Sequence, residues 1–264
     1  MTSLGVLIEV ADAVGTVTFS RPEALNALDD DAKSALLTGL RDLAADRGVR
    51  AVVLTGTGRA FCAGQDLREH VQRLTQSSAA EVWRTVPEQY NPIALTLHTM
   101  DKPVLAAVNG VAAGAGASLA FLADVRLVAT SASFTLAFAG VGLSCDTGCS
   151  WTLPRLIGTT RAMELLISGR SVSAAEALAL GIATEVVPDE DFADRVAVRA
   201  RALAAGPSLA YGAIRQAVGY AAGAPLAESL AFEAEQMRRT GGSADHRSAV
   251  DAFLAKQRPV FTGQ

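Results

Sequence analysis

Residues 103–129 read PVLAAVNGVAAGAGASLAFLADVRLVA, and this stretch decides the fold. The apolar run at 104–108 predicts a buried strand, and the small residues at 110–116 predict a tight turn into a helix over 117–123. A second apolar run at 125–129 predicts the next strand. Strands that alternate with helices are typical of a parallel sheet with its helices packed outside.

The same stretch raises the question of a membrane span, because residues 103–123 contain no charged side chain and are long enough to cross a bilayer. Asn109 and several glycines interrupt the run, so a buried strand followed by a buried helix is the better interpretation. Residues 1–10 lack the basic start and long apolar run of a secretion signal. The sequence therefore predicts a cytoplasmic protein without a membrane partner.

The alternation continues on the N-terminal side of this stretch. Residues 6–10 and 16–19 alternate as the two strands of a hairpin, and the apolar run at 49–54 predicts another buried strand. Between them, the three aspartates at 29–31 are typical of a helix N-terminus, where carboxylates are stabilised. These elements extend the alternating pattern almost to the start of the chain.

On the C-terminal side, helical periodicity takes over from the strands. Glycine, proline and serine separate four expected helices, at about 191–205, 208–221, 226–239 and 244–256. We therefore expect two units, an α/β core over residues 1–190 and an all-helical region over residues 191–264.

The composition is globular, with 50% hydrophobic residues, 19% charged residues and a net charge of −4. No basic stripe indicates a nucleic-acid partner, so any phosphate group must be held by a few local cations or helix ends. The odd number of cysteines (Cys62, Cys145 and Cys149) indicates reduced thiols. The three histidines are scattered singly, so no metal site is predicted.

Three glycine-rich segments join a strand to a helix and could carry chemistry: residues 59–67, 109–118 and 142–151. In the first, glycine lets a backbone amide turn toward a pocket, and Asp66 could cap the next helix. In the second, small residues at a helix start leave amides that favour an anion, although close helix packing would also need them. A dinucleotide site is excluded, because Gly114 and Gly116 are not followed by a glycine at the required offset.

The third segment places Asp146 in an apolar neighbourhood just before a predicted helix. An acid there is usually a helix N-cap, and base rates favour that role. Burial would raise its pKa while the helix end would lower it, which also suits a general base. The residues alone leave both interpretations open.

Three motifs together are far more specific: SRPEALNAL at 20–28, VLTG at 53–56 with FCAGQDL at 61–67, and KPVLAAVNG at 102–110. They closely resemble the crotonase superfamily, also called the enoyl-CoA hydratase/isomerase family, and the match runs from about residue 4 to residue 263. The resemblance implies an α/β fold of the ClpP/crotonase type, a spiral of ββα units. It also implies a C-terminal helical region that drives trimerisation, in a homotrimer or a dimer of trimers.

For the site, the resemblance implies an oxyanion hole that holds the oxygen of an acyl-CoA thioester between the backbone N–H groups of Gln65 and Ala115. Coenzyme A would enter as part of the substrate, so no metal or separate cofactor is implied. Its adenine and phosphate end is expected near Ala24, Leu25, Ala63, Asp66 and Leu67.

The chain departs from the hydratases of this family at two positions. Ser118 and Phe138 stand where those enzymes carry glutamates. Adding water across a double bond needs one group that activates water and one that delivers a proton, and serine and phenylalanine do neither well. Hydratase activity is therefore disfavoured.

One subgroup, which resembles this chain at residues 110–117 and 151–156, also lacks both glutamates: the 1,2-epoxyphenylacetyl-CoA isomerases of phenylacetate degradation. It carries an acid/base aspartate where Asp146 stands, and this favours catalysis over capping for Asp146. The implied reaction is a Δ3→Δ2 double-bond shift or an epoxide-to-oxepin ring expansion. Phe138 and Trp151 are expected to supply apolar wall, and Ser118 is expected to line the substrate site beside them.

Three alternatives follow from the same residues. The first is an enoyl-CoA hydratase, and the second is a non-catalytic acyl-CoA binder that has kept the amide-bearing loops and lost the acids. The third is a 4-chlorobenzoyl-CoA dehalogenase, in which an aspartate at position 146 attacks the aromatic ring. That enzyme also needs a histidine and a tryptophan, and Asn91 and Phe138 stand at the matching positions, so we rank it low.

Overall fold

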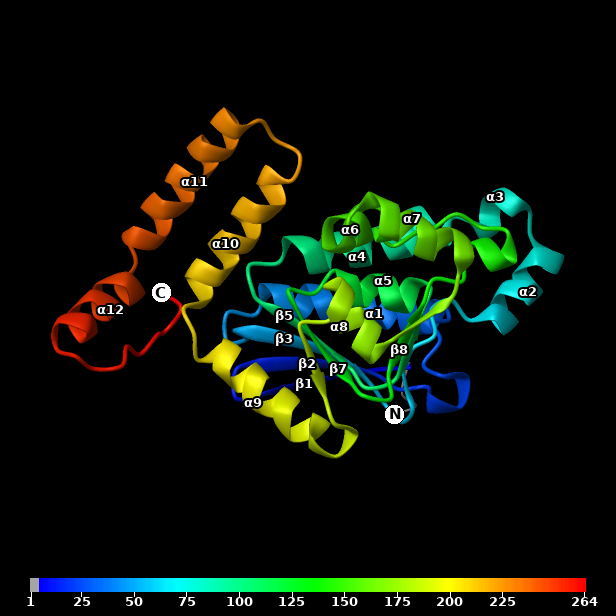
Figure 1. Ribbon diagram of the computed structural model, residues 1–264, viewed down its shortest axis with the longest axis horizontal. Helices are drawn as coiled ribbons and strands as arrows, with labels where there is room; N and C mark the ends of the chain where they lie inside the picture. The colour runs from blue at the N-terminus through cyan, green and yellow to red at the C-terminus, as the bar shows by residue number, and fades with distance from the viewer. Residues whose placement is uncertain (1–4) are drawn as a thin grey trace.

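The structure is a computed structural model and describes residues 5–264. Residues 1–4 lie outside the described residues. The expected core domain includes them, and the family resemblance begins at about residue 4. Two sheets form the centre of the molecule, with helices on their outer faces (Figure 1). The larger sheet has the strand order β1-β2-β3-β5-β7-β10, and the smaller one has the order β4-β6-β8-β9.

The N-terminal hairpin is confirmed. Strands β1 (Val6–Ala11) and β2 (Val14–Phe19) pair antiparallel. Asp12 and Ala13 form the two-residue turn, and both have positive φ angles, of 51° and 61°. This backbone matches the right-handed twist of the strands that it joins.

The other strands of the larger sheet are parallel, as expected. They are β3 (Ala51–Gly56), β5 (Val104–Val108), β7 (Val125–Ala129) and β10 (Glu185–Val187). All five residues of β5 are buried, which is typical of a parallel strand covered on both faces. The apolar run that opened the sequence argument is therefore a central strand.

The smaller sheet was not predicted. Its strands are only three residues each: β4 (Ala60–Cys62), β6 (Val111–Ala113), β8 (Ser133–Thr135) and β9 (Ser171–Ser173). Such short segments carry too few residues to show a period. Strand β4 pairs parallel with β6, so the first two glycine-rich segments lie side by side.

Helix α1 (Asp30–Ala45) begins as the acidic run predicted, because the carboxylate of N-cap Asp29 accepts a hydrogen bond from the amide of Ala32. Helix α5 (Ala115–Phe121) is buried along its whole length. At Gly116 an added Cβ would lie 2.1 Å from the carbonyl oxygen of Cys62. Glycine there lets α5 pack directly on the backbone of β4.

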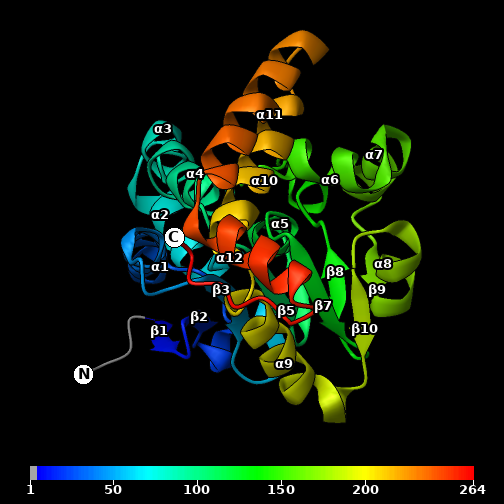
Figure 2. The same cartoon turned by 90° about the vertical axis from the view of Figure 1, so that its left-hand side faces the viewer.

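Shorter helical elements surround this core: η1 (Pro22–Ala24), α2 (Leu67–Gln76), α3 (Ala79–Val82), η2 (Val86–Tyr90), α4 (Asn91–Thr99), η3 (Ala139–Val141), α6 (Cys149–Ile157), α7 (Thr159–Ser168), α8 (Ala174–Leu180) and η4 (Asp189–Asp191). Figure 2 shows α1 to α4 gathered on one side of the sheets and α8 on the other. No helix within residues 5–264 combines the length and apolarity needed to cross a bilayer.

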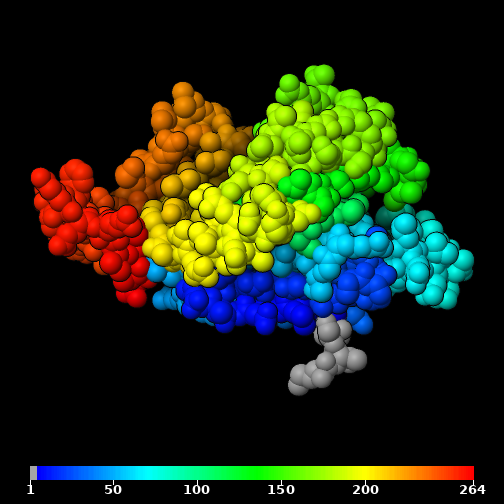
Figure 3. Space-filling view, turned by 60° about the horizontal axis from the view of Figure 1, so that its bottom comes forward, coloured from blue at the N-terminus to red at the C-terminus, as the bar shows by residue number. Residues whose placement is uncertain are grey.

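The C-terminal helices lie close to the predicted ranges: α9 (Phe192–Ala204), α10 (Ser208–Ala221), α11 (Leu226–Gly241) and α12 (Ala244–Leu254). Helices α10 to α12 extend to one side of the sheets (Figures 1 and 3). They expose large apolar side chains, including Val218 at 68%, Met237 at 72% and Phe253 at 80%.

Candidate active site

A cavity of about 870 Å³ collects residues from the η1 turn, the β4–α2 loop, η2, the β6–α5 turn and the segment before α6. It therefore joins all three glycine-rich segments. Most of the residues predicted for the site line it, namely Ala24, Leu25, Ala63, Gln65, Asp66, Leu67, Ala115, Phe138 and Asp146. Ser118 and Trp151 do not.

The backbone N–H of Gln65 faces away from the neighbouring strand-like segment. Leu28 donates its amide to the carbonyl of Gly64 at 2.7 Å, and its own carbonyl accepts from the amide of Asp66 at 3.0 Å. In an extended chain, successive peptide groups point to opposite sides, so the N–H between those two bonds points the other way. No acceptor within residues 5–264 takes it.

The N–H of Ala115 is free for a different reason. Ala115 is the first residue of α5, and the first amides of a helix have no partner within it. Gly64 has a φ of +86°, and a Cβ there would lie 3.1 Å from the Ala115 nitrogen. Glycine at position 64 thus keeps this amide accessible beside that of Gln65. Their role as thioester donors stays a prediction.

Asp146 is half-buried, and its side chain does not cap α6. That helix begins at Cys149 with Gly148 as its N-cap, without any side-chain capping bond. The capping interpretation of Asp146 is therefore wrong. Instead, Oδ1 of Asp146 accepts a hydrogen bond from the hydroxyl of Thr147 at 2.9 Å.

Burial raises the pKa of the Asp146 carboxyl, while the Thr147 hydroxyl and the positive charge of Lys33 act in the opposite direction. Thr147 holds the turn in a left-handed conformation, with a φ of 52°, which is uncommon for a β-branched residue. The turn thus fixes a carboxyl group on the cavity wall with its proton affinity raised.

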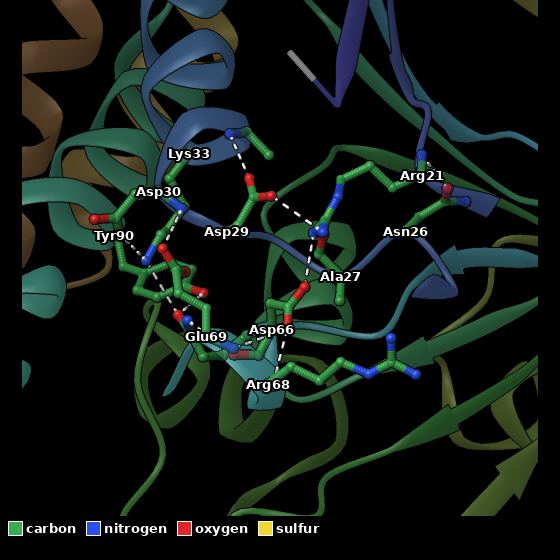
Figure 4. A network of polar contacts seen from close by, with 12 residues as sticks. Arg21, Asn26, Ala27, Asp29, Asp30, Lys33, Asp66, Arg68, Glu69 and Tyr90 are labelled. Carbon is green, nitrogen blue, oxygen red and sulfur yellow. Dashed lines mark hydrogen bonds and ion pairs between the residues drawn. The ribbon is translucent and has the colours of Figure 1, made fainter. Parts of the chain in front are cut away.

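Asp66 caps α2, as predicted. Its carboxylate accepts hydrogen bonds from the amides of Arg68 and Glu69 and an ion-paired bond of 2.9 Å from Arg21 (Figure 4). Burial would raise the pKa of Asp66, but the bonds from Glu69, Arg21 and Arg68 together outweigh it and lower the pKa. This carboxylate is held ionised in a structural role.

The η1 turn is fixed to the β4 region. The amide of Ala63 donates to the carbonyl of Leu25 at 3.0 Å, and the side chain of Asn26 donates to the carbonyl of Ala60 at 2.7 Å. Arg59 and Arg68 also line this part of the cavity. They are the local cations that a phosphate-bearing ligand would require in a chain of net negative charge.

Two predicted lining residues lie elsewhere. The hydroxyl of Ser118 is buried within α5 and donates to the carbonyl of Gly114 at 3.1 Å. Trp151 is 38% exposed and packs against the ring of His98 and the guanidinium of Arg155. The expectation of a Trp151 wall is therefore corrected.

Phe138 lines the cavity, together with Trp83 and Tyr90, which sequence reasoning missed. These three rings supply the aromatic part of the wall, and they come from separate segments. Trp83 and Tyr90 lie outside the sequence motifs, and no local pattern distinguishes a cavity-lining ring from a core ring there.

A buried polar network under the β4–α2 loop was also missed. The side chain of Lys33 is fully buried and donates to the side-chain oxygens of Gln65 at 3.2 Å and Thr85 at 2.7 Å. Tyr90 donates its hydroxyl to the same Gln65 oxygen at 2.8 Å. Burial raises the pKa of the Tyr90 hydroxyl well above its ordinary value, so it stays a donor.

A signal for Lys33 does exist in the sequence. Lys33 stands three residues before Leu36 and seven before Leu40, which places it on the buried face of α1. A lysine on an apolar helix face normally extends its amine to solvent. Its partners are remote in sequence, so spacing alone could not identify them.

Comparisons with known proteins bear on this geometry. The family model for enoyl-CoA hydratase/isomerase matches residues 9–264. The chain is 42% identical to the 1,2-epoxyphenylacetyl-CoA isomerase of Escherichia coli K12, with 98% of each chain covered. It is 41% identical to a protein described as a probable enoyl-CoA hydratase from Rhodobacter capsulatus, with 97% of each covered.

Solved structures agree on the fold. A Mycobacterium abscessus protein assigned to the enoyl-CoA hydratases/isomerases superposes with a TM-score of 0.94 at 42% identity, covering 98% of this chain and 100% of that one. An enoyl-CoA hydratase from Polaromonas sp. JS666 superposes with a TM-score of 0.91 at 31% identity, covering 97% and 99%. The crotonase-type α/β fold expected from the sequence is thereby confirmed.

Proposed function

This chain belongs to the enoyl-CoA hydratase/isomerase family, and we propose that within it the chain acts as an isomerase of acyl-CoA thioesters with Asp146 as the acid/base. One observation carries the proposal. The half-buried carboxyl of Asp146 shares a cavity with the free amides of Gln65 and Ala115, while Ser118 and Phe138 hold the two glutamate positions.

In this scheme the thioester oxygen accepts hydrogen bonds from the N–H groups of Gln65 and Ala115. When a proton leaves a carbon next to the carbonyl, or one conjugated with it, negative charge moves onto that oxygen. Preorganised donors stabilise the charge, and the loss of one typically raises the barrier by roughly 3 kcal/mol. Both donors are backbone groups, one on the β4–α2 loop that is hydrogen-bonded to Leu28 and one at the start of the buried helix α5, so they are held in place before the substrate binds.

Asp146 takes the proton from one carbon and returns it to another, so the double bond moves and no atom is gained or lost. A group with this task must accept and donate within one turnover, and it does so best with a pKa near the working pH. Burial shifts the pKa of Asp146 upward, in that direction. The same proton shuttle could assist ring expansion of an epoxide.

Hydration is disfavoured because neither position at which the hydratases of this family carry a glutamate holds an acid here. The hydroxyl of Ser118 is held by the carbonyl of Gly114, and Phe138 presents an aromatic ring to the cavity. Both lack the proton affinity to activate water. The aromatic wall formed by Trp83, Tyr90 and Phe138 suits an unsaturated or aromatic acyl group.

The coenzyme A portion would extend toward the η1 turn. Ala24, Leu25 and Ala63 give close access to the backbone there, and Leu67 adds apolar surface. Arg59 and Arg68 supply positive charge for the phosphates. Under this proposal coenzyme A arrives as part of the substrate, and the scheme uses no metal or redox group.

We also propose that the protein is a cytoplasmic homotrimer or dimer of trimers. The large apolar side chains exposed on α10 to α12 support an interface there. Sedimentation analysis would test this. A monomer at micromolar concentration would contradict it.

The deciding experiment compares wild type with Asp146→Asn on a 3-enoyl-CoA and on 1,2-epoxyphenylacetyl-CoA. We expect the variant to lose roughly 10²–10⁴-fold in kcat on the accepted substrate, which is the usual contribution of a positioned acid/base. Ser144→Ala, next along the cavity wall, is the matched control, since its hydroxyl has no part in the scheme.

The alternatives give different results. Rapid formation of 3-hydroxyacyl-CoA from crotonyl-CoA would identify a hydratase. Calorimetric binding of acyl-CoA without turnover on either substrate would identify a non-catalytic binder. Asp146→Asn activity within a few-fold of wild type would remove Asp146 from its proposed role.

A further inference from the structure

Lys33 lies in an unfavourable place for a cation. Its side chain has 0% solvent exposure, and it stands in the first turn of α1, where the helix dipole also disfavours positive charge. Burial lowers the pKa of its ammonium group. An apolar side chain would fill the same space without the cost of burying a charge, so packing alone does not explain a lysine at this position.

Three contacts of Lys33 lead toward the candidate site. From the loop before η2, the hydroxyl of Thr85 accepts its hydrogen bond, and within η2 the ring of Tyr90 lies 5.3 Å from Nζ. From the β4–α2 loop, Oε1 of Gln65 accepts a second bond. Thr85, Gln65 and Tyr90 each line the cavity, so the ammonium lies directly behind its wall.

Carboxylates from the start of α1, the start of α2 and the turn before α6 act on this ammonium. Asp30 pairs with it at 2.9 Å. Asp29, Glu69, Asp66 and Asp146 all oppose the lowering of its pKa.

Arg73 is a competing cation. It pairs with Asp30 and, at 3.8 Å, with Glu69. Part of the negative charge around Lys33 is therefore already neutralised by Arg73. The positive charge of Lys33 also lowers the pKa of the Asp146 carboxyl on the cavity wall.

We propose that Lys33 is a positioning residue, which clamps the side chain of Gln65 and supplies the positive charge behind the thioester site. This deepens the proposed function and rests on it. Oε1 of Gln65 accepts from both Lys33 and Tyr90, so the side chain is fixed at its far end. The backbone N–H of the same residue is the donor assigned to the thioester oxygen.

Two effects follow from this arrangement. Release of the clamp lets the Gln65 loop shift, and a displacement of about 1 Å at a reacting group can cost roughly 10²-fold in rate. Removal of the charge weakens the stabilisation of negative charge in the cavity, both on the thioester oxygen and on Asp146. The positioning of Gln65 depends on two hydrogen-bond donors, Lys33 and Tyr90, whereas the positive charge comes from Lys33 alone.

Three variants separate these effects. Lys33→Met removes the clamp and the charge and keeps the length of the side chain. Tyr90→Phe removes the other donor to Gln65 and changes no charge. Arg41→Met removes a cation from the exposed face of the same helix and is the matched control.

Two measurements are made on each variant. The first is the absorption of bound cinnamoyl-CoA, whose conjugated acyl group shifts to the red when its thioester oxygen is polarised. The second is the pH dependence of kcat. The spectral measurement needs no turnover, so it tests Lys33 even if the proposed isomerisation is wrong.

For Lys33→Met we expect loss of at least half of the red shift, a fall in kcat/KM of tenfold or more, and an acidic midpoint of kcat at higher pH. Tyr90→Phe should lose part of the red shift and keep its acidic midpoint. Arg41→Met should match wild type in both measurements. If neither wild type nor any variant turns over substrate but the red shifts differ as expected, the proposed reaction is wrong and the role of Lys33 in positioning Gln65 is supported.

The proposal is overturned if folded Lys33→Met keeps the red shift and the acidic midpoint of wild type. If Lys33→Met does not fold, the double variant Lys33→Met/Asp30→Asn, which removes both members of the ion pair, takes its place. A wild-type red shift in that double variant overturns the proposal equally. Should the double variant also fail to fold, a wild-type red shift in Tyr90→Phe overturns the clamp.

Discussion

The hydroxyl of Thr147 donates a 2.9 Å hydrogen bond to Oδ1 of the adjacent Asp146. Thr147 adopts a left-handed backbone, so the turn that carries the proposed acid/base also carries the group that tunes it. Burial and this bond act on the pKa of Asp146 in opposite directions. The balance between them sets the pH range in which the carboxyl can take a proton.

Thr147→Val removes this hydrogen bond and keeps the side-chain shape. The hydroxyl lowers the pKa of Asp146, so its removal lets burial raise that pKa further. A general base acts when it is deprotonated, so the acidic limb of the kcat–pH profile should move to higher pH. A profile with the wild-type acidic limb would show that another group controls this limb.

Gly64→Ala tests the approach to the Ala115 amide. The backbone at Gly64 is left-handed, and the new methyl group would lie 2.8 Å from the carbonyl oxygen of Ala113 and 3.1 Å from the Ala115 nitrogen. We expect kcat/KM to fall roughly 10²-fold, as for loss of one oxyanion donor. Gly140→Ala, where the methyl group meets no atom within 4 Å, should keep wild-type kinetics.

Gly116→Ala tests the packing of α5 on β4. The added methyl group would meet the carbonyl of Cys62 at 2.1 Å, and backbone cannot move aside as a flexible side chain can. Overpacking of this kind typically costs about 1–3 kcal/mol in the free energy of unfolding. Urea unfolding measures this loss of stability. The control is Gly241→Ala, at a helical position where the added methyl group meets no atom within 4 Å. Equal unfolding midpoints for the two variants would contradict the close contact at Gly116.

The three thiols should differ in reactivity. Burial raises the pKa of both Cys62 and Cys149 to about 12, so neither forms thiolate near neutral pH. Cys145 is half-buried and lines the cavity. Mass spectrometry after brief iodoacetamide treatment should find a single modified cysteine, Cys145, and acyl-CoA should slow its modification. Labelling at Cys62 in the native protein would contradict its burial.

The pH dependence of stability should reflect Asp66. Its folded-state pKa lies below the ordinary value of 3.8, so its ionised form stabilises the fold above that value and this stabilisation is lost as the pH falls through the folded pKa. Asp66→Ala removes the cap of α2, which costs about 1 kcal/mol for a typical cap. The difference in unfolding free energy between wild type and variant should shrink as the pH is lowered below 4.

The sequence predicted those parts of the fold that carry a local signal, such as an apolar run, a helix cap or helical spacing. The run at Val104–Val108, the N-terminus of α1 and the four C-terminal helices all carry local signals of length and capping. Strands β4 and β6 do not, because three residues show no period. Their pairing is a long-range property of the folded chain.

The candidate site divides in the same way. Gln65, Ala115 and Asp146 were identified because family motifs mark them, and the cavity brings all three together. Residue propensities alone favoured a capping role for Asp146, which the start of α6 at Cys149 excludes. Trp151 was misplaced, because the motif around it gives no information on which face of α6 meets the cavity.

The network around Lys33 could not be predicted from motifs. Its bonds reach Gln65, Thr85 and Tyr90, which the chain brings together from separate loops. A lysine in a helix is usually solvated, and only the burial of the whole α1 face makes it otherwise. The role of Lys33 can therefore be recognised only in the folded structure, where its partners lie close together.

The parallel pairing of β4 with β6 has a consequence for how this scaffold can change. The backbone N–H groups of Gln65 and Ala115 follow closely on strand β4, which is buried, and strand β6, which pairs with it, whereas Asp146 stands on a turn whose neighbours Leu143 and Ser144 are exposed. Under the proposed mechanism, the donors to the thioester oxygen are thus difficult to mutate, whereas the proposed acid/base can be exchanged without disturbing them. A protein engineer could therefore graft new turns at residues 143–148 onto an unaltered anchor and obtain different reactions of the same activated thioester.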